Sequence, residues 1–73
     1  MEFRQLRYFI EIVKAQNYSN AAKNLFVTQP TLSWNMNKLQ EELGAKLIYQ
    51  VGNKVMPTTA GSILFEKGQK ILA

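Results

Sequence analysis

One segment of the chain, TQPTLSWNMNKLQEELG at residues 28–44, carries signals for both ends of a helix. Thr28 is a residue type that caps helix N-termini, and Pro30 falls in the first turn, where its missing N–H costs nothing. Gly44 comes directly after EEL and is typical of a helix C-terminus. The sequence therefore predicts a helix that begins at about Gln29 and ends before Gly44, and the rest of the fold must be built around it.

This helix has one apolar and one polar face. At about 100° per residue, four side chains form a stripe that is expected to face a core: Leu32, Met36, Leu39 and Leu43. Trp34, the only tryptophan, lies almost opposite, in the company of Pro30, Asn37, Lys38 and Glu41, with Thr31 and Ser33 on the flanks. A large aromatic ring is unusual on a face that only has to be solvated. The polar face is therefore a candidate binding surface.

Helical spacing also marks two segments before this helix. Residues 3–16 place Phe3, Leu6, Phe9, Ile10 and Val13 on one stripe, with Tyr8 and Ile12 off the stripe, where they can meet a second neighbour. Ser19 is then expected to cap a short second helix that contains Ala21, Ala22 and Leu25. The two alanines are small enough for another helix to approach closely.

Beyond Gly44 the pattern favours a hairpin followed by a last helix. The segment KLIYQVGNKVM at 46–56 has two short apolar runs around Gly52-Asn53, a pair typical of a hairpin turn. Pro57 ends the second run, and Thr58 is expected to cap the last helix. Three helices, a small hairpin and a fourth helix, with a tight connection between the second and third helices, predict a mainly α fold. We expect a winged helix-turn-helix with a three-helix core, a two-stranded β wing and a C-terminal helix.

The residue types argue against an enzyme or a metalloprotein. A chain of 73 residues without Cys, His or Asp lacks the usual zinc ligands, a thiol or Ser–His nucleophile and the commonest general base. We expect no catalytic residues, no metal site and no cofactor. No apolar stretch is long enough for a membrane span, and the N-terminus is charged, so we expect a cytoplasmic protein. The net charge of +4 is compatible with nucleic acid or an anionic surface as partner.

The polar face of residues 29–38 fits DNA. In a helix-turn-helix the second helix of the pair enters the major groove with its N-terminal residues aimed at base edges. The face offers Gln, Asn, Ser, Thr and Lys, which suit base edges and phosphates, with Trp34 at its middle. The alternative is a winged-helix module for protein–protein contact, in which Trp34 is the interface anchor.

Five short motifs together resemble the N-terminal DNA-binding domain of LysR-type bacterial transcriptional regulators. They are LRYF at 6–9, NYSNAA at 17–22, TQPTLS at 28–33, LQEELGAKL at 39–47 and TTAG at 58–61, and the similarity runs from Phe3 to Leu72. The resemblance implies one domain, 1–73, with a helix-turn-helix at about 19–43, a wing at about 46–56 and the start of a linker helix at about 59–73. It also implies a longer protein whose effector-binding domain, absent from this chain, would be the part that senses a small molecule.

The resemblance implies a DNA-binding surface as well. In the family the residues that match Gln29, Pro30 and Ser33 lie at the DNA, and a basic wing tip reaches toward the minor groove. With the polar face described above, the residues expected at double-stranded DNA are Ser19, Gln29, Pro30, Thr31, Ser33, Trp34, Asn37, Lys38, Asn53 and Lys54. The family usually has arginine at the position of Trp34 and often at those of Gln50 and Asn53. Lys38 and Lys54 remain as basic groups for phosphate contacts.

The last helix carries two apolar stripes. Ala60, Ile63, Leu64 and Ile71 share one face, which is expected to face the core, and Gly61, Phe65, Gly68 and Leu72 gather on another about 90° away. The family resemblance implies that subunits pair through this helix. We therefore expect the second stripe to form the contact of a homodimer or higher homo-oligomer.

Overall fold

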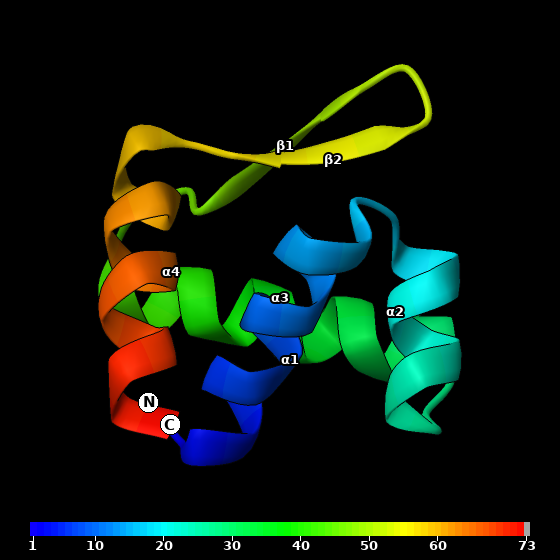
Figure 1. Cartoon of the computed structure of the whole chain (residues 1–73), viewed down its shortest axis with the longest axis horizontal. Coiled ribbons are helices and arrows are strands. Elements are labelled where there is room, and N and C mark those ends of the chain that lie inside the picture. Colours follow the sequence, from blue (N-terminus) through cyan, green and yellow to red (C-terminus); the bar gives the residue numbers. More distant parts are fainter. Residues whose placement is uncertain (73) are drawn as a thin grey trace.

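The computed structural model describes residues 1–72, which form four helices and one hairpin. The elements follow in the order α1 (Phe3–Ala15), α2 (Tyr18–Leu25), α3 (Gln29–Leu43), β1 (Ile48–Val51), β2 (Lys54–Pro57) and α4 (Thr59–Leu72). Figure 1 shows α1 at the centre, with α2 and α4 at opposite ends and the hairpin above it. This is the expected winged helix-turn-helix. Among residues 1–72, no helix is long and apolar enough to cross a membrane.

Helix α1 supplies the middle of the core. Leu6, Phe9 and Ile12 are almost completely buried, because α1 contacts all three of the other helices and β2. Ile12 thus meets the second neighbour that its position off the main stripe indicated. The expectation for Phe3 was wrong, since 70% of this residue is exposed. Phe3 is the first residue of α1, and a helix end that projects past its neighbours has nothing to pack against.

Helix α2 begins earlier than the sequence predicted. Its N-cap is Asn17, whose backbone is extended and whose Oδ1 accepts a hydrogen bond from the Asn20 amide at 2.6 Å. Ser19 therefore lies in the first turn, and its assignment as the cap was wrong; asparagine and serine are both good caps, and Asn17 stands where the backbone turns. Ala21 and Ala22 are buried as expected.

Helix α3 begins and ends where its signals indicated. The Thr28 hydroxyl accepts from the Thr31 amide at 3.3 Å, and Gly44 has the left-handed φ of 66° that a helix-ending glycine adopts. Leu32, Met36 and Leu39 are fully buried, whereas Leu43 is 43% exposed and does not join the core. Like Phe3, Leu43 is at a helix end, where the packing partners run out.

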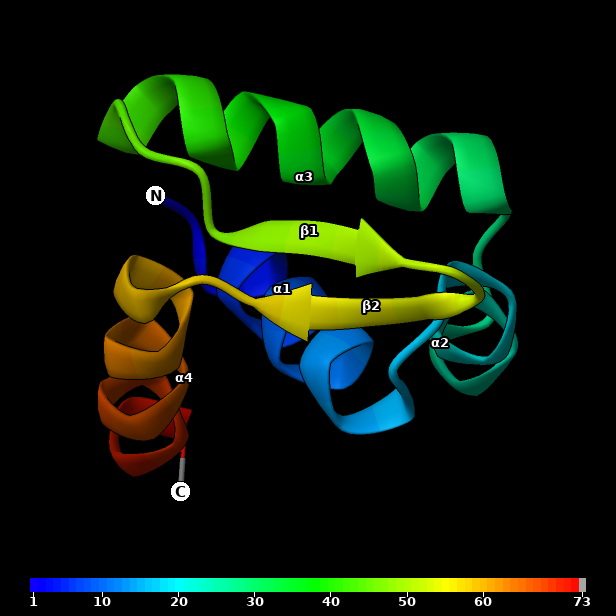
Figure 2. The ribbon, with the colours of Figure 1, turned by 90° about the horizontal axis from the view of Figure 1, so that it is seen from above.

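The hairpin forms the wing, and it packs against α3 and α1. The two strands are antiparallel, Val51 pairs with Lys54, and Gly52, with φ of 60°, supplies the left-handed turn between them. The Val55 amide donates to the Gln16 carbonyl at the end of α1, with an N···O distance of 2.8 Å. Seen from above, α3 runs alongside the hairpin (Figure 2). The wing and α3 are therefore held as one surface.

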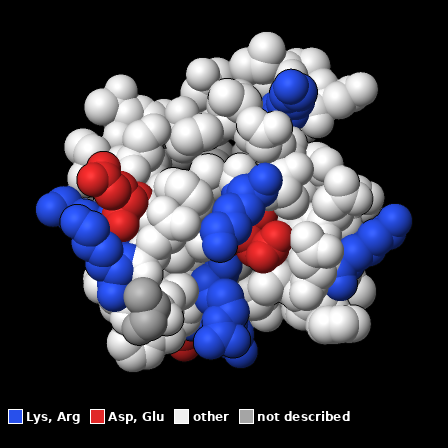
Figure 3. Space-filling model, in the orientation of Figure 1, with Lys and Arg blue, Asp and Glu red and all other residues white. Residues whose placement is uncertain are grey.

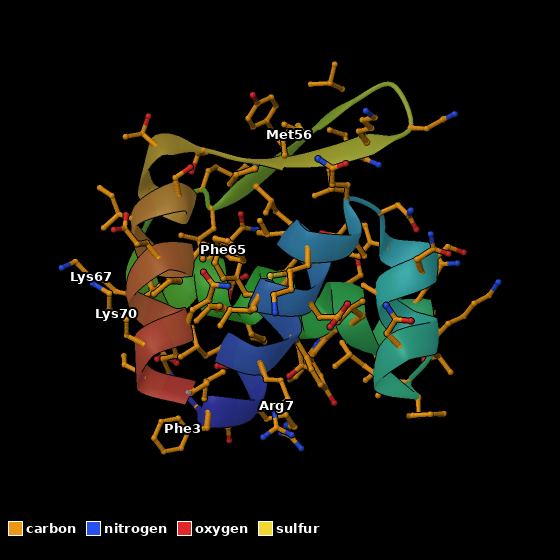
Figure 4. The ribbon with its side chains drawn as sticks, in the orientation of Figure 1. Phe3, Arg7, Met56, Phe65, Lys67 and Lys70 are labelled. Atoms are coloured by element: carbon orange, nitrogen blue, oxygen red, sulfur yellow. The ribbon has the colours of Figure 1, made fainter. Side chains whose placement is uncertain are left out.

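Helix α4 packs on α1 through the stripe that was expected to face a partner. The Thr58 hydroxyl accepts from the Gly61 amide at 3.0 Å and so caps the helix, as predicted. Gly61 and Gly68 are buried, and Phe65 and Leu72 pack against the core. Figure 4 shows Phe65 pointing from α4 toward the interior, while Lys67 and Lys70 project away.

The two stripes of α4 are therefore not divided as the sequence predicted, although Leu64 packs against the core as expected. The four residues predicted for the dimer contact, Gly61, Phe65, Gly68 and Leu72, pack within the domain. Ile63 and Ile71, which were expected to face the core, are 53% and 57% exposed. The physical reason is the close approach that glycine permits. A Cβ atom at Gly61 would lie 1.9 Å from the Leu47 carbonyl oxygen. Only glycine therefore lets α4 approach the backbone directly before β1 so closely.

Candidate nucleic-acid interface

The ten residues expected at DNA all have exposed side chains. They come from three elements: Ser19 from α2, the residues 29–38 from α3, and Asn53 and Lys54 from the tip of the wing. A hydrogen bond joins the first two elements, because the Gln29 amide donates to the Ser19 hydroxyl with an N···O distance of 3.1 Å. Ser19 thus orients the first residue of α3, a role that differs from the capping role first assigned to it.

Trp34 stands on the solvent side of α3. It is 60% exposed, and Lys38, one turn further along, places its Nζ 5.5 Å from the centre of the indole ring. This separation is within the range of a cation–π contact. Lys38 Nζ also lies 3.7 Å from Glu41 Oε1, so the cation sits between a ring and a carboxylate. Both contacts are exposed and weak, and a phosphate can therefore compete for the ammonium group.

Beneath this face lies a polar residue that sequence reasoning missed. Asn35 is 5% exposed, although it belongs to none of the apolar stripes. Its Nδ2 donates to the Thr31 carbonyl at 2.9 Å, while its Oδ1 has no partner among the described residues. A buried asparagine between Trp34 and Met36 has no distinct signature in the sequence, because asparagine is ordinarily a surface residue.

Gln40 connects α3 to the wing, and Tyr18 of α2 lies beside that connection; both residues were missed. Gln40 Oε1 accepts from the Leu47 amide at 2.8 Å and from the Ile48 amide at 3.4 Å, which fixes the start of β1 against α3. Tyr18 and Gln40 line a hollow between α3 and the wing, together with Asn37. Burial raises the pKa of the Tyr18 hydroxyl above its ordinary value of 10.0, so the group stays neutral at physiological pH.

Positive charge is not confined to α3. Figure 3 shows the face opposite α3, where basic side chains are spread over α4, α1, α2 and the wing, with acidic groups among them. The net charge of +4 therefore supports association with an anion but does not by itself select a surface. Within residues 1–72, no three His, Cys, Asp or Glu side chains lie together so as to hold a metal ion.

Comparison with known protein families gives one match over most of the chain. A family model described as bacterial regulatory helix-turn-helix protein, lysR family, matches residues 3–62. The chain is 40% identical over 73 residues to the HTH-type transcriptional regulator BudR of Klebsiella aerogenes, and it spans 51% of that protein. It is 37% identical over 73 residues to the HTH-type transcriptional regulator BenM of Acinetobacter baylyi, of which it spans 24%. Both relatives are described as transcriptional regulators.

Solved structures agree with the fold in detail. The CbnR_DBD–DNA complex superimposes with a TM-score of 0.93 at 40% identity, over 99% of this chain and 83% of that one. The BenM_DBD complex with benA site 1 DNA gives 0.95 at 38% identity, over 99% of this chain and 84% of that one. Both structures contain DNA, and both share the arrangement of helices and wing described above.

Proposed function

Because the chain belongs to the lysR family of bacterial regulatory helix-turn-helix proteins, we propose that it binds double-stranded DNA in a sequence-specific manner and takes part in the control of transcription. Helix α3 is the recognition helix, and its N-terminal half enters the major groove. The tip of the wing, at Asn53 and Lys54, lies near the minor groove. The site of action is the cytoplasm, where the DNA is found.

The exposed face of the N-terminal half of α3 carries this proposal. Gln29 donates one amide hydrogen to Ser19, which leaves its amide oxygen available to a donor on the DNA. Ser33 and Asn37 are exposed on the same face and can each donate and accept a hydrogen bond. These are the side-chain types that read base edges in the major groove.

Phosphate contacts supply the remaining affinity in this proposal. Lys38 and Lys54 are exposed at the recognition helix and the wing tip, on the two parts of the surface that face the sugar–phosphate walls. Such contacts release counterions from the DNA, so we expect the affinity for any duplex to fall as the salt concentration rises.

A gel shift tests the proposed function. The probe is a duplex from the region upstream of the gene that encodes the chain, and the control is an unrelated duplex of equal length. With excess non-specific competitor, we expect a retained complex on the upstream duplex only. If neither duplex gives a complex at low salt, the DNA proposal fails, and the exposed Trp34 then points to a protein partner.

We also propose that the protein pairs through α4, on the side that carries Ile63 and Ile71 and not on the stripe first expected. One exposed stripe of this helix is formed by Ala60, Ile63, Lys67 and Ile71. Two isoleucines at more than 50% exposure are apolar surface that a second copy could cover. A two-fold dimer would present two recognition helices, and helix-turn-helix dimers bind pairs of half-sites in this way.

A further inference from the structure

A hollow lies on the flank of α3 that faces away from the wing. Its volume is about 390 Å³, and it is formed between the first two turns of α1 and the N-terminal half of α3. The lining residues are Arg4, Tyr8, Pro30, Thr31, Trp34 and Asn35. Arg4 is the only charged residue among them, and 63% of its side chain is exposed. The guanidinium group is thus available beside the half of α3 that is proposed to enter the major groove.

The charges around Trp34 divide this flank into two parts. A second hollow, toward the C-terminal half of α3, is lined by Arg4 and Lys38 but also by three carboxylates: Glu2, Glu41 and Glu42. The three acidic groups offset the two cations there, so this hollow attracts a phosphate less strongly. The hollow beside Pro30 and Thr31 contains no carboxylate. An anionic strand is therefore favoured along the first hollow over the second.

The dimensions of DNA place a phosphate wall on this flank. The major groove is about 12 Å wide, and a helix with its side chains is about 10–12 Å across, so a recognition helix nearly fills the groove. The sugar–phosphate backbones on the two sides of the groove then contact the protein elements that lie on either side of the helix. Figure 1 shows the wing above α3 and the first turn of α1 below it. Thus the wing can meet one wall, and the first turn of α1 can meet the other.

We propose that Arg4 contacts the DNA backbone and so positions α3 in the groove, and that it reads no base. This inference rests on the proposed function. Within residues 1–72, Arg4 pairs only with Glu2, at an N···O distance of 3.3 Å, and both side chains are more than 60% exposed. An exposed pair of this kind is weak, whereas a guanidinium can bind a phosphate through two parallel hydrogen bonds. The partner is the sugar–phosphate backbone of double-stranded DNA, whatever the base sequence.

Arg7 provides a matched control. It is also an exposed arginine of α1, but it lines a different hollow, with Ile10, Glu11, Lys14, Gln69 and Leu72, between α1 and the end of α4. Figure 4 shows Arg7 projecting outward at the lower edge of the view. Arg4→Gln and Arg7→Gln remove the same charge from the same helix. A difference in DNA binding between the two variants therefore reports contact with DNA and not net charge.

The experiment is a salt titration of binding to two labelled duplexes of unrelated sequence, followed by fluorescence anisotropy. We expect Arg4→Gln to weaken binding to both duplexes by a similar factor. It should also lower the slope of log affinity against log salt by about one, while Arg7→Gln keeps the wild-type slope. Arg4→Lys should retain most of the slope, because the charge is kept, and circular dichroism should show equal helix content in all variants.

Two results would overturn the inference about Arg4. One is an equal change of slope in Arg4→Gln and Arg7→Gln, and the other is a loss in Arg4→Lys as large as in Arg4→Gln. If the wild-type chain binds neither these duplexes nor its upstream region at any salt concentration, the proposed function itself fails. The wild-type titration therefore separates the failure of the function from the failure of this contact.

Discussion

Trp34 lies at the middle of the proposed DNA surface, at a position where the resemblance to the family leads one to expect arginine. An arginine can donate two hydrogen bonds to O6 and N7 of guanine, whereas an indole offers an apolar plate with a single N–H. The apolar feature of the major groove is the methyl group of thymine. We therefore expect a preference for A·T pairs at the position that Trp34 faces.

Replacement of Trp34 tests this expectation. Trp34→Ala should leave the melting temperature almost unchanged, because the residue is 60% exposed and the core residues Leu32 and Met36 lie on the other side of α3. Binding to the specific site should weaken by about 1 to 3 kcal/mol, the usual cost of losing one base contact. Trp34→Arg should shift the preference toward guanine, as measured by competition between site variants.

The competing interpretation gives Trp34 a structural role through Lys38, whose ammonium lies near the ring. If that were its main role, Trp34→Ala would lower the melting temperature by many degrees, and the folded fraction would bind DNA with wild-type affinity. That pair of results would contradict the assignment of Trp34 to the interface.

At the scale of single residues, the sequence identified the buried and exposed sides of α3 correctly except at Leu43 and Asn35. Leu32, Met36 and Leu39 follow a periodicity that depends only on local helix geometry, so they could be predicted. The exposure of Leu43 and Phe3 could not, because it depends on how far the neighbouring elements extend. Asn35 is the converse case: neighbouring elements cover this polar residue, and local periodicity does not indicate that they do.

At the scale of elements, α4 shows the limit of sequence periodicity. Two stripes about 90° apart are evident from the spacing, but periodicity does not say which of them faces inward. The glycines decide this, because a helix surface without Cβ atoms can approach a neighbouring backbone most closely. Gly61 meets the Leu47 carbonyl, and Gly68 meets the side chains of Leu6 and Ile10. Cap and turn signals, by contrast, act within a few residues, and those at Thr28, Gly44 and Gly52 were confirmed.

The two glycines should differ in their tolerance of alanine. A Cβ at Gly61 would lie 1.9 Å from a backbone oxygen, which cannot move without shifting the chain, so we expect Gly61→Ala to cost about 3 kcal/mol or more of stability. At Gly68 the nearest atom is Leu6 Cδ1 at 2.8 Å, the end of a side chain that can adjust. There the gain in helix propensity, about 1 kcal/mol, offsets part of the strain. Urea unfolding of both variants would measure the difference, and an equal loss of stability would contradict this packing of α4.

The exposed face of α4 makes a separate prediction about self-association. Ile63→Glu should abolish a concentration-dependent increase in mass in sedimentation, because it places a charge in the proposed contact. Ser62→Glu adds the same charge to a neighbouring position on another side of the helix and should behave like the wild type. If the wild type is monomeric at all concentrations, or if both variants associate equally, this face is not a dimer contact of the 73-residue chain.

At the scale of the whole molecule, hydrogen bonds join α3, the wing and α1. Gln40 ties α3 to the start of β1, and the Gln16 carbonyl ties α1 to β2, so the three parts are held in a fixed relation. The sequence predicted the order of these elements from local signals. The hydrogen bonds that join them could not be predicted, because they connect residues far apart in the chain.

The central claim is that double-stranded DNA covers the face of α3 that carries Trp34. Because Trp34 is the only tryptophan, its fluorescence reports on this face alone. The most direct measurement is acrylamide quenching of that fluorescence in the free chain and in the chain saturated with its upstream duplex, with saturation verified by anisotropy of the labelled duplex. The account predicts that bound DNA protects Trp34 and lowers the quenching constant. An unchanged quenching constant at saturation would contradict it.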